Sequence, residues 1–218
     1  MRLQKILAIA LALCCLTGTA LAELSARTVE EKHAAGSFKA ATPRLLLQGF
    51  EARQAANEAL ELTLDKFRVL AEKVGDTAVE YEITAEKDDY ISFIFLGGTR
   101  LPELNMDVGG AHAVVLDKKT GAALPLEHFV RIPGIKYVRE QVDAGKITAV
   151  CMDGHTELDP AFVKELKAVP QEYFIDKLGN VYLVATEADI FGAGTPLLAL
   201  PAKALADIYV SGDAAKNK

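Results

Sequence analysis

Apolar positions in the first half of the chain recur with two different periods. Between residues 50 and 74 they follow one another at steps of three and four among good helix formers, and Gly75 comes next. After this glycine the period changes to two, with Val79, Tyr81 and Ile83 alternating with polar neighbours. The first pattern predicts a long amphipathic helix and the second predicts a strand of an antiparallel sheet. The apolar residues that we expect the helix to bury are Leu60, Leu64, Phe67, Ala71 and Val74.

Shorter patterns predict the remaining elements. Strands are expected over residues 90–96, 111–116, 173–176, 181–185 and 197–200, where apolar and β-branched residues lie between turn residues. Short helices are expected within 135–145, from Asp159 onward and over 201–208, because Asp159 can cap a helix that begins at Pro160. The fold class that follows is α+β: a mostly antiparallel sheet packed against one long N-terminal helix, with additional short helices.

The two ends of the chain lack such patterns. Residues 23–42 are mixed, small and polar with no sustained period, so we expect a flexible leader there. Residues 211–218 are small and polar, which predicts a disordered tail. The sequence therefore favours a single α+β domain over residues 43–210.

The first residues have the order typical of a secretion signal. Arg2 and Lys5 precede an apolar run over residues 6–16, and Ala20-Leu21-Ala22 provides a small-residue cleavage site. We expect cleavage after Ala22 and an extracytoplasmic protein, either periplasmic or secreted, with no membrane attachment after cleavage.

Two alternatives to a cleaved signal stay open. The apolar stretch ends near Ala22 and is at the short limit of the roughly 20 residues that span a membrane, so an uncleaved anchor is the less favoured alternative. Cys14 and Cys15 lie in this stretch and could carry a lipid, although Leu13 stands where a small residue would be expected.

The net charge of the chain favours some classes of binding partner over others. The net charge is −6, and removal of residues 1–22 takes away two cations, which leaves 22 basic and 30 acidic residues, or −8. Such a charge opposes binding to nucleic acid and to anionic membranes and favours a basic partner. The same cleavage leaves Cys151 as the lone cysteine, so no intramolecular disulfide can form.

No catalytic motif is found. The sequence contains no G-x-S-x-G elbow, no H-E-x-x-H helix and no phosphate-binding loop, and its four histidines are scattered. We therefore expect a protein without enzymatic activity, cofactor or metal. The most ligand-like cluster alternates around Gly154 and lacks the pattern of a calcium-binding EF-hand; its members are Asp153, His155, Glu157 and Asp159.

Several short motifs occur in a recognisable order. They are Gly-Gly-Ala-His at 109–112, the turn at 117–121, the segment 173–179, the segment 187–194 and Leu-Pro at 200–201. In this order and spacing the chain resembles the RsiV-type extracytoplasmic domain family. That family includes the lysozyme-receptor domain of the anti-sigma factor RsiV and the non-catalytic N-terminal region of PdaC-like peptidoglycan deacetylases.

The resemblance implies an α+β receptor domain that binds a basic protein, with lysozyme as the family's partner, or a cell-wall ligand such as peptidoglycan. Two residues depart from the family pattern, since Ile190 and Phe191 replace a Pro-Tyr pair. Phe191 could be an exposed anchor or could fold back into the core, and His112 could close a hydrogen bond within the fold instead of binding a ligand. The candidate ligand-binding residues are His112, Glu187, Ile190, Phe191 and Gly194.

The leading hypothesis is an extracytoplasmic, non-enzymatic binding protein. The alternative suggested by the deacetylase association is a peptidoglycan-modifying envelope protein, although the metal-binding Asp and paired His of that catalytic domain are not found in this chain. A purely structural envelope protein is the third possibility.

Overall fold

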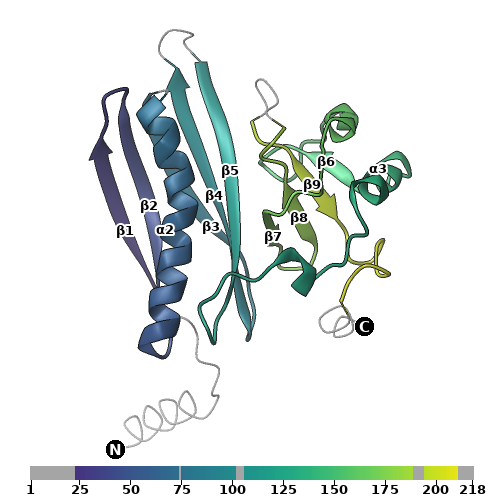
Figure 1. Ribbon diagram of the computed structural model, residues 1–218, viewed down its shortest axis with the longest axis horizontal. Coiled ribbons are helices and arrows are strands. Elements are labelled where there is room, and N and C mark those ends of the chain that lie inside the picture. The colour runs from purple at the N-terminus through teal and green to yellow at the C-terminus, as the bar shows by residue number, and fades with distance from the viewer. Residues whose placement is uncertain (1–22, 74, 102–105, 189–193, 211–218) are drawn as a thin grey trace, which may run out of the picture.

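The computed structural model describes residues 23–73, 75–101, 106–188 and 194–210. Two sheets and two α-helices make up this part of the chain (Figure 1). Within it, no helix has both the length and the apolar character that a membrane span requires. The first sheet and its helix comprise β1 (Glu23–Lys32), β2 (Ser37–Leu46), α2 (Phe50–Lys73), β3 (Thr77–Glu86), β4 (Tyr90–Leu101) and β5 (Met106–Asp117). The second half comprises η2 (Leu126–His128), α3 (Ile135–Asp143), β6 (Thr148–Val150), η3 (Pro160–Lys164), β7 (Tyr173–Ile175), β8 (Val181–Val184) and β9 (Leu197–Leu200).

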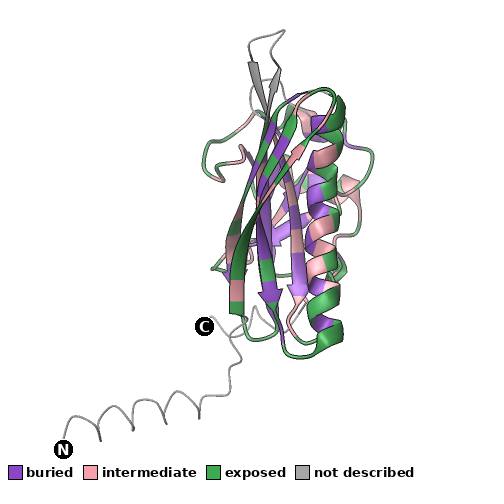
Figure 2. Cartoon of the chain, turned by 90° about the vertical axis from the view of Figure 1, so that its left-hand side faces the viewer, coloured by how far each residue is buried: buried purple, intermediate pink, exposed green. Residues whose placement is uncertain are grey.

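The first sheet has the strand order β1-β2-β3-β4-β5. Neighbouring strands are antiparallel, except that β2 and β3 are parallel and α2 connects them. The long helix lies along one face of this sheet, and Figure 2 shows its buried side turned toward the strands. An α+β fold with a mostly antiparallel sheet against one long helix is thus confirmed.

The prediction of a flexible leader over residues 23–42 is wrong. These residues form β1 and most of β2, which pair in one register from Glu23–Leu46 to Lys32–Ser37. The strand pattern of β1 is hard to see in the sequence because charged side chains occupy positions that face the helix.

Ion pairs take the place of apolar packing between β1 and α2. Arg68 of the helix binds Glu31 at 3.1 Å and Glu61 at 3.1 Å, and Arg27 lies 3.5 Å from Glu61. The guanidinium of Arg68 also lies over the ring of Phe38, 5.1 Å from its centroid. Desolvation lowers the pKa of Arg68, but hydrogen bonds and the nearby carboxylates outweigh it, so the pKa is raised. The inward charges of β1 are therefore paired with charges of the helix, although Arg27 stays half-exposed.

The pairing between β2 and β3 is short. Only Phe38–Thr77, Lys39–Ala78 and Ala40–Val79 pair across it. Beyond this point the helix supplies a substitute partner, because the Asn57 amide donates to the carbonyl oxygen of Leu45 (3.0 Å) and accepts from its N–H (3.1 Å). One side-chain amide thus satisfies both backbone groups of a β2 residue.

The second sheet has the order β6-β9-β8-β7 and is antiparallel. It packs on the face of the first sheet that α2 leaves free, since alternate residues of β4 face the two sides. Phe93 and Phe95 join the cluster beneath the helix, whereas Ile94 joins a cluster with residues of the second sheet. The other buried members of that second cluster are Ala111, Ala113, Val150, Phe174, Val184 and Leu197.

Most of the other predicted elements are confirmed, and two are corrected. α3 lies within the expected range 135–145, and the hairpin of β7 and β8 lies at 173–184. The segment after Asp159 is a 3₁₀-helix, and its cap is as expected, since the Asp159 carboxylate accepts from Ala161 N. Residues 201–208 form consecutive turns instead of a helix, in which Ala204 N and Leu205 N donate to Pro201 O and Ile208 N donates to Leu205 O. Leu205 and Ile208 are buried in the core.

Candidate binding site at the edge of β5

β5 is the strand where the first sheet meets the second. It is the last strand of its sheet, and its outward N–H groups find side-chain partners. Ala111 N donates to the Thr195 hydroxyl (3.1 Å), and Ala113 N donates to the Glu172 carboxylate (3.3 Å). Both partners come from the ends of second-sheet strands, so the edge of β5 is covered and the two sheets are joined there.

Glu172 joins three elements. Its Oε2 atom lies 2.9 Å from His112 Nδ1 on β5, and its Oε1 atom accepts from Lys66 Nζ of α2 at 2.8 Å. The His112 ring also packs edge-on against Phe67, with centroids 4.8 Å apart. We call Lys66, His112, Glu172, Gly194 and Thr195 the β5-edge cluster.

The charge of Glu172 is stabilised despite its burial. Burial raises the pKa of this carboxyl, but hydrogen bonds and charges from His112 and Lys66 outweigh the burial, so the pKa lies below its usual value. The side chain of His112 is 17% exposed and that of Glu172 is 23% exposed. A histidine oriented by a carboxylate is half of a nucleophilic site, yet no hydroxyl or thiol contacts the ring among the described residues. The pair therefore acts as a link between elements, and ligand binding by His112 stays a prediction.

The connection from β8 to β9 ends on this edge. Gly194 is buried with φ of 69°, and a Cβ there would lie 2.9 Å from both the Gly109 carbonyl oxygen and Met152 Cε. Only glycine fits this conformation and this close approach without strain. A Cβ at Gly109 would lie 2.5 Å from Met152 Cε, the far end of a flexible side chain, so this position is less restricted. Gly194 thus fixes where the connection meets β5.

The structure brings some of the predicted ligand-binding residues together. Gly194 and His112 both lie at the β5 edge, with Thr195 hydrogen-bonded to the residue before His112. Glu187 lies on the other arm of the connection, where it is exposed. Ile190 and Phe191 lie outside the described residues, so their placement stays a prediction.

The acidic cluster around Gly154 has a structural role. The Asp153 carboxylate accepts from the backbone N–H groups of His155 and Thr156 (both 2.8 Å) and from the Thr156 hydroxyl (2.6 Å). The Thr156 hydroxyl and these backbone groups lower the pKa of Asp153 to about 2. Asp159 caps η3, and no group of three or more metal-ligating side chains occurs in the described part of the chain.

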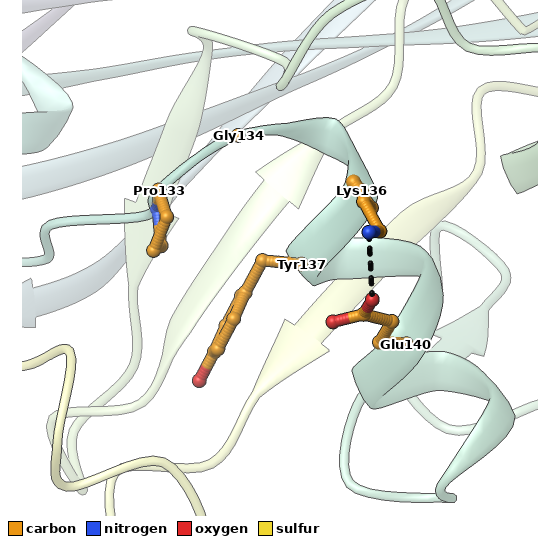
Figure 3. Close-up of a pocket in the computed structure, with 5 residues that line it drawn as sticks. All are labelled: Pro133, Gly134, Lys136, Tyr137 and Glu140. Carbon is orange, nitrogen blue, oxygen red and sulfur yellow. Dashed lines mark ion pairs between the residues drawn. The ribbon is translucent and has the colours of Figure 1, made fainter.

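An open hollow lies at the beginning of α3. Its volume is about 330 Å³, and it is lined by Pro133, Gly134, Lys136, Tyr137 and Glu140. Figure 3 shows the Tyr137 ring crossing the hollow beside the ion pair of Lys136 and Glu140, whose nearest atoms are 3.8 Å apart. The Tyr137 hydroxyl lies 3.4 Å from an Asp207 carboxylate oxygen, and burial together with that charge raises the pKa of Tyr137. The hollow is open and lacks a cluster of converging charged groups.

Comparison with solved structures identifies the fold. The chain is similar in fold to DUF3298 family proteins. One, from Pseudomonas aeruginosa PAO1, has a TM-score of 0.57 and 11% sequence identity, with 88% of this chain and 96% of that chain covered. Another, from Bacteroides fragilis NCTC 9343, has a TM-score of 0.56 and 9% identity, with 88% and 95% covered. No family model and no curated protein matches the sequence. At such identities the similarity concerns the fold alone.

Three members of the β5-edge cluster were not predicted from the sequence. Lys66 stands on a helix between buried positions, Glu172 is one of many acids, and Thr195 follows a glycine in a loop. The one available signal was the glycine pair at 109–110, which indicates a close approach of another segment to β5.

Proposed function

We propose that this chain is an extracytoplasmic, non-enzymatic binding protein that engages a basic protein, with lysozyme as the candidate, through the connection between β8 and β9. The alternative ligand is peptidoglycan. The observation that carries the proposal is the attachment of this connection to the sheet: Gly194 packs on Gly109, while Glu187 on the other arm is exposed. A connection that is fixed at one end loses less conformational entropy when it binds than a free one.

Charge supports a basic partner. The chain carries a net charge of −6, and the acidic balance grows if residues 1–22 are removed. Opposite net charges speed the encounter of two proteins and make the association rate depend on salt. A basic C-type lysozyme is therefore a suitable first probe.

The test is binding of the purified protein to a basic C-type lysozyme at low and at physiological salt. We expect saturable binding that survives physiological salt and weakens at least tenfold in Phe191→Ala, as for an aromatic anchor. The matched control is Phe50→Ala, because Phe50 is 74% exposed at the start of α2, on the opposite face of the sheet. Equal losses in both variants, or binding that vanishes at physiological salt, would contradict the proposal for lysozyme.

Glu187→Lys tests the electrostatic contribution. We expect it to reduce the association rate more than Glu58→Lys, which changes the charge equally on the exposed side of α2. If lysozyme does not bind at all, the same pair of variants is compared on peptidoglycan fragments.

A further inference from the structure

β1 is the free edge of the first sheet. It pairs with β2 along its whole length, and no strand pairs with its other side in the part of the chain that the structure describes. Figure 1 places β1 at the outside of the molecule, at the opposite edge of the sheet from β5. A strand edge with unpaired N–H and C=O groups is a template on which another strand can form.

β1 carries charged side chains but lacks the backbone features that commonly protect an edge strand. It contains no proline, and its pairing with β2 shows no register shift. By contrast, β3 and β4 have a register shift after Ile83, and the β5 edge is covered by side chains. On the inward face of β1, Arg27 and Glu31 bind Glu61 and Arg68 of the helix, and Arg27 remains half-exposed.

We propose that β1 pairs with β1 of a second copy of this chain, antiparallel, about a two-fold axis at Val29. In such a pair, residues directly opposite each other lie on the same face of the sheet. An axis at Val29 places Arg27 of each copy opposite Glu31 of the other. On the outer face it places Thr28 opposite Glu30. No two like charges lie directly opposite each other in this register.

The other registers are less favourable. An axis at Arg27 places this residue opposite itself and Glu23 opposite Glu31. An axis at Glu30 places two carboxylates opposite each other. An axis at Thr28 brings no lysine or arginine opposite an acid. An axis at Ser25 also brings Arg27 opposite Glu23, but it pairs only residues 23–27 of β1. Like charges directly opposite each other destabilise strand pairs and unlike charges stabilise them, so charge and the length of the paired segment together select the axis at Val29.

This pairing would join two five-stranded sheets into one. Both α2 helices then lie on one face, and both second sheets lie on the other face. Because β5 is at the opposite edge from β1, the two β5 edges lie at the far ends of the joined sheet. The interface is therefore separate from the candidate binding site, and the inference does not depend on the proposed function.

The test is sedimentation equilibrium of the purified protein over a wide range of concentrations, with two opposite substitutions at one exposed residue. Thr28→Glu places one carboxylate opposite Glu30 of the other copy, twice by symmetry, and is expected to weaken the dimer roughly tenfold; Thr28→Lys is expected to strengthen it by a similar factor. The matched controls are Leu178→Glu and Leu178→Lys, which make the same charge changes at a residue that is 74% exposed in the turn between β7 and β8.

The proposal predicts a dimer whose dissociation constant moves in opposite directions with the two Thr28 substitutions and changes much less with the Leu178 pair. A protein that stays monomeric at every concentration would overturn it. So would a dimer that is indifferent to Thr28, or one that responds equally at Thr28 and Leu178, since its interface would then lie elsewhere. Because Thr28 is exposed, neither substitution disturbs the core.

Discussion

Glu172 shows what one half-buried carboxylate does in this fold. It stands before β7, yet it binds a cation of α2, a histidine of β5 and the N–H of Ala113. Its pKa is lowered in the folded protein, so the folded state favours the ionised form. The resulting stability is present above the ordinary pKa of 4.5 and is lost as the pH falls through the lower, folded value.

Glu172→Gln is therefore expected to lower the free energy of unfolding by about 1.5–3 kcal/mol at neutral pH, the range for hydrogen bonds to charged groups. The difference from the unsubstituted protein should shrink as the pH falls from 4.5 through the lower pKa of the folded state, below which both proteins lack the charge. Urea unfolding at several pH values measures this. Glu187→Gln is the control, because Glu187 is exposed and should change stability little. A loss that is independent of pH would contradict the electrostatic explanation.

At the scale of elements, the hairpin of β1 and β2 is held mainly by the helix. Three residue pairs link it to β3, whereas Arg68 and Asn57 of α2 bind β1 and β2 directly. The Asn57 amide thus takes the place of a neighbouring strand for Leu45, although Asn57 belongs to a helix.

Asn57→Ala should uncover the N–H and C=O groups of Leu45 and destabilise the protein by about 1–3 kcal/mol. Because the loss is local, amide hydrogen exchange should speed up first in the second half of β2 and in β1. Glu58→Ala, at the neighbouring exposed position, is the matched control. Unchanged exchange in β2 would mean that water replaces the amide at little cost.

The elements that the sequence predicted are those with an apolar period. The stripe from Leu60 to Ala71 is buried as expected, as are alternate residues of β4. The strand β1 was not predicted because Arg27 and Glu31 occupy positions where apolar residues would indicate a strand. Their partners Glu61 and Arg68 are distant in sequence. The β5-edge cluster was not predicted for the same reason, because hydrogen bonds between remote segments leave no local pattern in the sequence.

For the whole molecule, periodicity alone did not reveal that the strands divide into two sheets. Ile94 and Phe174 share one buried cluster, and Ile175 N donates to the Ser92 hydroxyl across the interface at 2.9 Å. With a shared core and a buried hydrogen bond, we expect the two sheets to unfold together.

Leu183→Ala tests this cooperativity, because Leu183 is fully buried in β8. We expect a loss of about 2–5 kcal/mol. Native-state hydrogen exchange should show that the slowest amides of β4 lose protection to the same extent as those of β8. The control is Leu178→Ala, since this residue is 74% exposed. Independent unfolding would leave the protection of β4 unchanged.

The order of strands in the second sheet also constrains when it can form during synthesis. β6 ends at Val150, but its neighbour β9 begins at Leu197 and lies between β6 and β8. The hairpins of the first sheet join segments close in sequence, whereas the pairing of β6 must wait until almost the whole chain has been made. A growing chain can therefore complete the helix-covered sheet early, while the apolar face that later receives the second sheet stays open until the last strand arrives.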